Sequence, residues 1–229
     1  MTLSPEAGRV LGCLVEKQLT TPQQYPLTLN ALTAAANQAT NRDPVVDLGE
    51  DMVEAAVDEL RAERLVRVVL PSHGRSVKRY RHVLDEVYGL DAARSGLLAV
   101  LLLRGPQTVG ELRARTERMV DLASVDAVAD ELTVLAEHPD DLVRSVARAP
   151  GQKEDRWQQV VAAPWGGTGD APAAGVRDDG EAPPPVEWLA TDPEPEHGME
   201  AVRREVADLR LEVAALRSEL DDLRGSLGG

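Results

Sequence analysis

The sequence predicts a mainly helical α+β fold with two tandem winged-helix domains, a disordered acidic linker and a C-terminal coiled-coil helix. Three observations predict this architecture: a diverged internal repeat, an abrupt change of composition after residue 161, and a heptad pattern near the C-terminus. The predicted boundaries are 1–86 and 87–161 for the two winged helices, 162–198 for the linker and 199–227 for the coil.

The internal repeat combines one helical match with two strand matches. The segment VEAAVDEL at 53–60 matches VDAVADEL at 125–132, an offset of 72. Residues 65–67 match residues 142–144 at an offset of 77, and residues 78–80 match 155–157 at that same offset. A constant offset across two separate strands indicates one supersecondary unit that is used twice.

Each copy predicts three helices followed by two strands. In the first copy, Ser4, Pro5 and Glu6 mark a helix start, because Ser caps well, Pro suits the first position and an acid suits the first turn. Apolar faces at helical spacing and branched runs give the other elements. The expected helices lie near 29–36, 50–64, 92–104, 109–117 and 124–137, and the expected strands near 65–70, 77–83, 142–147 and 156–161. Three helices closed by a two-stranded hairpin describe a winged helix.

The segment from 162 to 198 differs in composition from everything before it. It holds 7 Pro and 6 Gly in 37 residues, with eight acidic side chains and one basic. Such a stretch buries too little apolar surface to offset its ordering entropy, so we expect a disordered acidic linker. Trp165 and Trp188 are unusual in such a segment. They are either docking anchors for a partner, or aromatic side chains without a special role, in which case Trp165 can pack on the last strand.

Residues 199–227 carry apolar side chains at two positions of a seven-residue repeat, as in a coiled coil. Every e position is Arg, while Glu205, Glu212 and Glu219 hold g positions. This sorting pairs opposite charges only in a parallel dimer, so we expect a parallel homodimer rather than a solvated helix folded back on its own domains. The expected dimerisation residues are Val202, Val206, Leu209, Val213, Leu216, Leu220 and Leu223.

Composition limits the classes of protein. The net charge is −14, of which residues 162–229 contribute −9, so the globular part is only mildly acidic. The longest apolar run, 97–103, is too short to span a bilayer, and the N-terminus lacks an apolar signal core, so we expect a cytoplasmic protein. The lone Cys13 excludes an internal disulfide. No phosphate-binding glycine loop, metal-ligand spacing or nucleophile–base arrangement stands out, so we expect no enzyme activity, no metal and no cofactor.

Two long motifs resemble a known family. EKQLTTPQQYPLTLNAL at 16–32, followed by NQATNRDP at 37–44, and LLRGPQT at 102–108 with GELR at 110–113 resemble the YceH family of uncharacterised bacterial proteins. The resemblance covers roughly residues 3–161. It implies a tandem winged-helix fold and no established reaction.

The first copy carries eight extra residues between its second and third helices, and the polar run at 37–44 lies there. Its candidate recognition residues are Asn37, Gln38, Asn41, Arg42 and Asp43. One interpretation is a surface that recognises phosphate or a partner backbone. The other is a capping and turn network in which Asn and Asp bond local backbone and Arg42 pairs with a carboxylate.

Two ligand classes remain open. The third helices, near 50–64 and 124–138, carry six and four acids, which disfavours the major-groove insertion that many winged helices use. Basic residues gather instead in the first wing, where Arg75, Lys78, Arg79 and Arg81 are the candidate DNA contacts. The sequence therefore predicts a transcriptional regulator that contacts DNA through this wing, or a scaffold whose acidic surfaces bind an unidentified protein.

Overall fold

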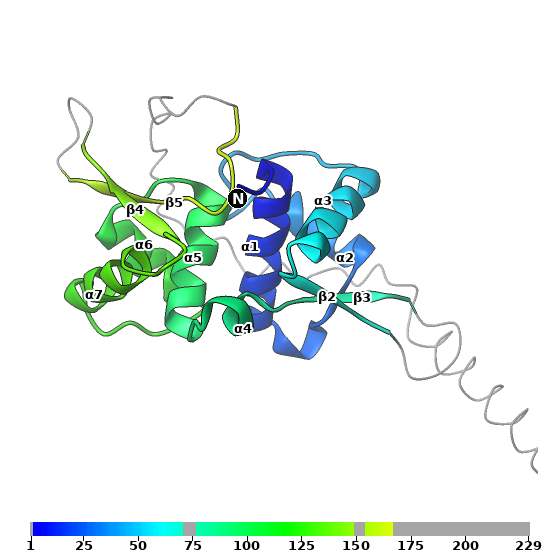
Figure 1. The fold of residues 1–229 in the computed structure, drawn as a ribbon, viewed down its shortest axis with the longest axis horizontal. Coiled ribbons are helices and arrows are strands. Elements are labelled where there is room, and N and C mark those ends of the chain that lie inside the picture. Colours follow the sequence, from blue (N-terminus) through cyan, green and yellow to red (C-terminus); the bar gives the residue numbers. More distant parts are fainter. Residues whose placement is uncertain (1, 71–76, 149–153, 167–229) are drawn as a thin grey trace, which may run out of the picture. The chain divides into compact units, whose positions relative to one another are not determined.

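The computed structural model describes residues 2–70, 77–148 and 154–166. In this part the protein is an α+β structure with seven α-helices and two small antiparallel sheets (Figure 1). The predicted coiled coil at 199–227 lies outside the described residues, as does the predicted linker beyond residue 166, including Trp188. Arg75, at the tip of the predicted first wing, also lies outside them.

The first copy of the repeat begins with α1, Pro5–Thr20, which starts at the predicted Ser4 cap: the Ser4 hydroxyl accepts a hydrogen bond from the Ala7 N–H. A 3₁₀ turn, η1, Pro22–Gln24, and a two-residue strand, β1, Leu27–Thr28, follow; neither was expected from the sequence. The helices α2, Leu29–Ala36, and α3, Glu50–Ala62, lead into the strands β2, Val66–Val69, and β3, Arg79–His82. The sheet order is β1-β3-β2, which leaves β2 at an edge.

A short helix that the sequence did not suggest, α4, Leu84–Tyr88, connects the copies. The second copy then repeats the order with α5, Ala92–Arg104, α6, Val109–Thr116, α7, Val125–Ala136, and the strands β4, Val143–Val146, and β5, Arg156–Gln159. The bounds of α5 are those that the sequence predicts.

Equivalent hydrogen bonds show that the repeat is structural. In the first copy the Val83 N–H donates to the Leu65 carbonyl, and 77 positions later the Val160 N–H donates to the Leu142 carbonyl. Leu27 faces Tyr80 across the first sheet, and Gln107 pairs with Trp157 in an isolated antiparallel bridge of the second. The two copies therefore share one strand geometry as well as one element order.

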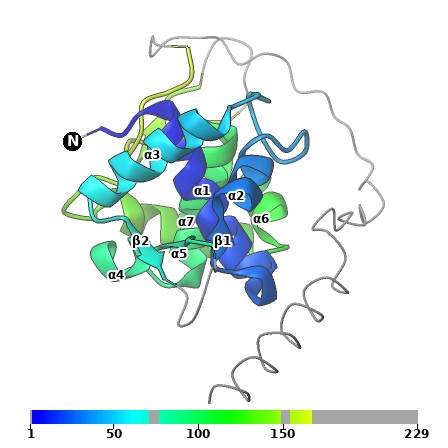
Figure 2. The same ribbon diagram turned by 90° about the vertical axis from the view of Figure 1, so that its right-hand side faces the viewer.

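The two copies pack together through α1 and α5, which lie side by side at the centre of Figures 1 and 2, with the two hairpins at opposite ends in Figure 1. Two glycines of α1 permit the close approach. A Cβ at Gly12 would lie 2.9 Å from Leu103 Cγ, and one at Gly8 would lie 2.6 Å from Ala162 Cβ. The core is built almost entirely from Leu, Val and Ala of both copies, so the interface between them belongs to one continuous apolar interior.

The end of the described chain returns to the start of α1. The Leu3 N–H donates to the Val161 carbonyl at 2.9 Å, and the Ala163 N–H donates to the Leu3 carbonyl at 2.8 Å. Trp165 packs against the core, and the Arg9 guanidinium lies 5.4 Å from the centre of its ring. The first residues of the predicted linker thus pack on the first copy.

We expect Gly12→Ala to lower the free energy of unfolding by about 1–3 kcal/mol, because the new methyl group overpacks against Leu103 on α5. Gly110→Ala is the matched control: nothing lies within 4 Å of its added Cβ, so it should be neutral or stabilise by about 0.4–1 kcal/mol. Denaturant unfolding measures both. Equal stability of the two variants would contradict close packing of α1 on α5.

Candidate functional site at the junction of the two repeats

The long loop between α2 and α3 is held by its own polar side chains. The Asn37 side chain donates to the Leu48 carbonyl at 2.9 Å and accepts from the Leu48 N–H at 2.8 Å. The N–H of Asp43 donates to the Leu103 carbonyl of α5, while its carboxylate is exposed. Asn41 has a φ of 59°, a left-handed conformation that Asn tolerates better than most residues. The loop is thereby fixed to both copies.

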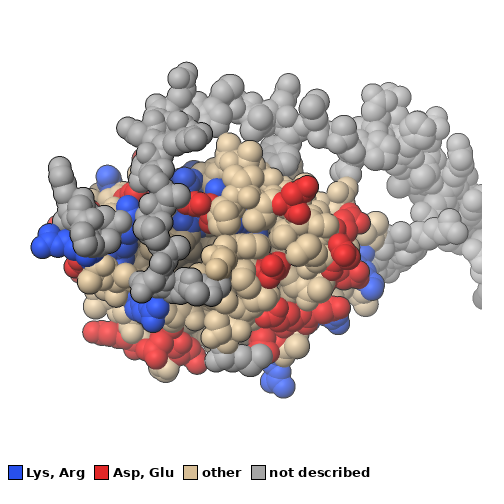
Figure 3. All heavy atoms as spheres, turned by 90° about the horizontal axis from the view of Figure 1, so that it is seen from above, with Lys and Arg blue, Asp and Glu red and all other residues tan. Residues whose placement is uncertain are grey.

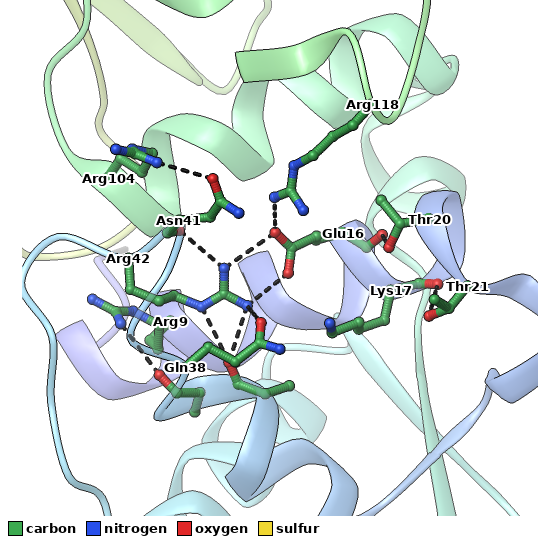
Figure 4. A network of polar contacts seen from close by, with 12 residues as sticks. Arg9, Glu16, Lys17, Thr20, Thr21, Gln38, Asn41, Arg42, Arg104 and Arg118 are labelled. Carbon is green, nitrogen blue, oxygen red and sulfur yellow. Dashed lines mark hydrogen bonds and ion pairs between the residues drawn. The ribbon is translucent and has the colours of Figure 1, made fainter. Parts of the chain in front are cut away.

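Arg42, from this loop, is buried and forms the centre of the network in Figure 4. Its guanidinium donates to both carboxylate oxygens of Glu16, at 3.1 and 2.6 Å. It also donates to the Ala35 carbonyl, the Asn41 carbonyl and the Gln38 side-chain oxygen. All five N–H bonds of a guanidinium can be satisfied by these acceptors. Arg42 thus makes the carboxylate pairing that the capping interpretation expects.

Glu16 is shared between the two copies. Its carboxylate, fully buried on α1, also accepts a hydrogen bond from Arg118, which follows α6 and is 40% exposed. Burial opposes ionisation of Glu16, but the hydrogen bonds and charge of Arg42 and the charge of Arg118 outweigh it. They hold the pKa of Glu16 below its ordinary value of 4.5. The carboxylate therefore stays ionised while it joins the repeats.

Arg104, at the end of α5, makes a second connection between the copies. Its guanidinium donates to the Asn41 side-chain oxygen at 3.0 Å. Burial lowers the pKa of Arg104, and the nearby charges of Arg115 and Arg118 lower it further. We call this group the junction cluster; its members are Glu16, Asn41, Arg42, Arg104 and Arg118.

Arg9 and Cys13 lie on the buried side of α1, beside the cluster. Arg9 donates to the Ala36 and Pro44 carbonyls at 3.3 and 2.7 Å, which ties the end of α2 and the middle of the α2–α3 loop to α1. Cys13 is fully buried, and burial raises the pKa of its thiol, so the thiolate form is disfavoured. Both residues therefore support the fold around the cluster.

Among the candidate DNA contacts of the predicted first wing, Arg79 and Arg81 lie on β3 and Lys78 comes just before it. Lys78 and Arg79 are exposed, and Arg79 donates to the Pro26 carbonyl at 2.9 Å. Arg81 pairs with Glu86 at 3.0 Å, and Arg67 of β2 pairs with the same carboxylate at 2.9 Å. The structure leaves Lys78 and Arg79 as the more available of the described candidates.

His82, on the same strand, is buried and does not contribute positive charge. The ring Nε2 of His82 hydrogen-bonds the Gln18 side chain, and the backbone N–H of His82 donates to the Tyr25 hydroxyl. Burial lowers the pKa of His82 to about 4, so the ring is neutral near pH 7 and adds no charge to the wing.

The third helix of each copy presents a surface without basic excess. On α3 the carboxylates of Glu50, Asp51, Glu54 and Asp58 are exposed, and Asp58 pairs with Arg61 at 2.7 Å. On the face drawn in Figure 3, Lys and Arg are most frequent toward the end that holds the second copy, where Asp and Glu also form a patch along the lower edge, while Asp and Glu dominate the end that holds the first. The acidic side chains that the sequence places on α3 are thus largely exposed to solvent.

The sequence alone assigned no role to Glu16, Arg104 or Arg118. Glu16 and Arg118 are 102 positions apart, so no local pattern connects them.

Within the described residues, no helix combines the length and the apolar character that crossing a bilayer needs. In the same part of the chain, His, Cys, Asp and Glu side chains form no group that could hold a metal ion.

The junction cluster falls inside a segment that matches a known family. Residues 3–152, which cover the first copy and the second copy up to the segment before β5, match the family described as "Protein of unknown function, DUF480". The chain belongs to the DUF480 family. The prediction of a family of uncharacterised proteins is therefore confirmed. The YceH designation stays a prediction.

Named relatives of this DUF480 chain are UPF0502 proteins. One from Geotalea uraniireducens is 46% identical over 185 residues, covering 81% of this chain and 80% of its own. One from Geobacter sulfurreducens is 51% identical over 154 residues, covering 67% and 69%. One from Mesorhizobium japonicum is 41% identical over 208 residues, covering 91% and 93%. The last match is longer than 161 residues, so the similarity extends beyond the two repeats.

We expect Glu16→Gln to lower the free energy of unfolding by about 3–5 kcal/mol, because it leaves the buried Arg42 without its anion. Asp58→Asn, which breaks an exposed pair on α3, should change stability by less than about 1 kcal/mol. Denaturant unfolding at pH 7 measures both variants.

The same pair predicts a pH dependence. Because the pKa of Glu16 in the folded protein lies below 4.5, its contribution is complete above that pH and is lost as the pH falls through the folded pKa. The stability difference between wild type and Glu16→Gln should therefore shrink in acid. A difference that stays constant from pH 7 to pH 3 would show that the carboxylate is not held ionised.

Proposed function

We propose that this chain is a non-enzymatic, homodimeric tandem winged-helix protein that binds basic surfaces of partner proteins through the exposed face of α3. The observation that carries the proposal is the row of carboxylates on that face. Glu50, Asp51, Glu54 and Asp58 are all exposed there.

The repeated element order supports the winged-helix assignment. Each copy has three helices followed by an antiparallel strand pair. In the first copy, β1 lies between the first and second helices and pairs with β3, and the Gln107–Trp157 bridge occupies the equivalent place in the second. Three helices closed by an antiparallel hairpin are what the winged-helix assignment requires, and these additional pairings place a further segment beside the hairpin in both copies.

The charge of α3 favours a protein ligand over duplex DNA. A winged helix that reads DNA commonly places its third helix in the major groove, where side chains meet bases and phosphates. Four exposed carboxylates in that position would face phosphate charge of the same sign. In α7 the exposed charged side chains are Asp126 and Asp130, and its sequence holds neither Lys nor Arg. A partner with basic side chains satisfies the same carboxylates.

DNA binding through the first wing is the second candidate. The exposed Lys78 and Arg79 favour it, since a wing can contact phosphates. The shared pairing of Arg67 and Arg81 with Glu86 weighs against it, because one carboxylate already neutralises part of the charge of this wing.

The homodimer is supported by the heptads at 199–227 and their sorted e and g charges. We expect the full chain to be a dimer by light scattering at micromolar concentration, and Leu209→Lys with Leu216→Lys to be monomeric, because two charges would enter the apolar seam. Ala207→Lys with Ala214→Lys adds the same charges at outer heptad positions and should remain dimeric. A monomeric wild type would overturn the dimer.

The choice of ligand is tested with the full chain and a fluorescent duplex of about 20 base pairs at low salt, where phosphate contacts are strongest. We expect no saturable change in anisotropy for the wild type. Glu54→Lys with Asp58→Lys should gain salt-dependent duplex binding, because it reverses charge on the helix that would enter the groove. Glu117→Lys with Glu137→Lys, equally charged but outside α3, should gain much less.

Saturable binding by the wild type that Arg79→Glu with Arg81→Glu abolishes would instead favour the DNA regulator. A protein partner is sought by placing a photo-crosslinking residue at Glu54 in cells, with the same residue at Glu137 as the control. Adducts that form at position 54 alone, and that disappear on Asp58→Lys, support the α3 surface.

A further inference from the structure

The junction cluster contains three guanidinium groups and one carboxylate, that of Glu16. Glu16 accepts from Arg42 and from Arg118, and Asn41 accepts from Arg42 through its carbonyl and from Arg104 through its side chain. Figure 4 shows Arg104 and Arg118 reaching toward these two acceptors from the second copy, above the side chains of the first. The cluster therefore holds more positive than negative charge.

The three arginines differ in what they can still bind. Arg42 is buried, and protein acceptors occupy its donors. Arg118 is 40% exposed and donates to Glu16 through one nitrogen, and Arg104 donates to Asn41 through one nitrogen. A guanidinium has five N–H donors, so Arg104 and Arg118 keep donors for a further acceptor while Arg42 fixes their partners in place.

The charged residues around the junction cluster do not neutralise its excess of positive charge. Arg115 lies near enough to lower the pKa of Arg104, and its ion pair with Glu111 is long, at 4.0 Å. Glu111 is engaged elsewhere, since it accepts from Arg156 at 3.1 Å and from the Thr108 N–H at 2.9 Å. Asp43 is the other acid close to Arg104, and its carboxylate is exposed.

We propose that Arg104 and Arg118 form a binding site for a small phosphate-bearing anion at the junction of the two repeats. Planar guanidinium groups bind phosphate oxygens through paired, charge-assisted hydrogen bonds. A small ligand fits better than a duplex, because Glu16, Asp43 and Glu111 lie around the arginines and would repel an extended row of phosphates. The bound anion would connect side chains of the second copy that also bind Glu16 and Asn41 of the first.

This site is separate from the α3 surface, so its test is independent of the proposed function. The probe is inorganic pyrophosphate, titrated into the full-length protein by calorimetry at low ionic strength. We expect saturable binding to the wild type and about tenfold or greater weakening in Arg104→Gln and in Arg118→Gln, since each removes charge-assisted hydrogen bonds. Arg61→Gln, which removes an exposed arginine of α3, is the matched control and should bind as the wild type does.

Asp43→Asn provides a variant that keeps both arginines. Its side chain is exposed, and removing its negative charge should tighten pyrophosphate binding several-fold. It remains informative if an arginine variant fails to fold, which circular dichroism would reveal.

Three outcomes would overturn the site: no saturable binding to the wild type, equal binding by the wild type and all variants, or no gain in Asp43→Asn. A short DNA duplex is titrated in parallel. If the duplex binds through Arg104 and Arg118 and pyrophosphate does not, the ligand is nucleic acid and the small-anion assignment is wrong.

Discussion

The buried carboxylate of Glu16 imposes the constraint on which the arrangement of the two repeats depends. An ionised group without solvent must be fully paired, and Glu16 obtains its partners from two directions: Arg42 from the α2–α3 loop and Arg118 from the second copy. Apolar contacts between α1 and α5 pack the two copies together, but they are not directional. The charged network adds direction, because few relative positions of the copies satisfy all its donors and acceptors.

The loop between α2 and α3 is what makes the copies unequal. The second copy connects the equivalent helices with a shorter segment. In the first copy the longer loop bonds its own backbone through Asn37, and it reaches the junction through Asn41, which accepts from Arg104, and Arg42, which binds Glu16. The run at 37–44, which the sequence offers as a recognition loop, is therefore only partly exposed: Arg42 is buried, Asn41 is half-buried and Asp43 is exposed. Its polar side chains serve the junction, and the charge available to a ligand comes from the arginines that they hold in position.

Local signals in the sequence predicted most of the elements. Ser4 and Pro5 mark the start of α1, and the apolar positions Val53, Ala56, Val57 and Leu60 of α3 are buried as their spacing indicates. The short elements η1, β1 and α4 were missed, because so few residues carry no periodicity and depend on tertiary pairing, as β1 does with β3. The junction cluster could not be predicted for the same reason: the contact of Glu16 with Arg118 exists only once both copies have folded and packed.

The covalent connection between the repeats, through α4, has a consequence for assembly. Packing of α1 on α5 is an intramolecular event, so it proceeds at the high effective concentration set by a short tether and does not weaken on dilution. Any association between separate chains follows mass action and weakens as the protein becomes scarce. Two kinds of interface in one polypeptide would thus respond differently to cellular abundance, one permanently formed and the other adjustable by expression level.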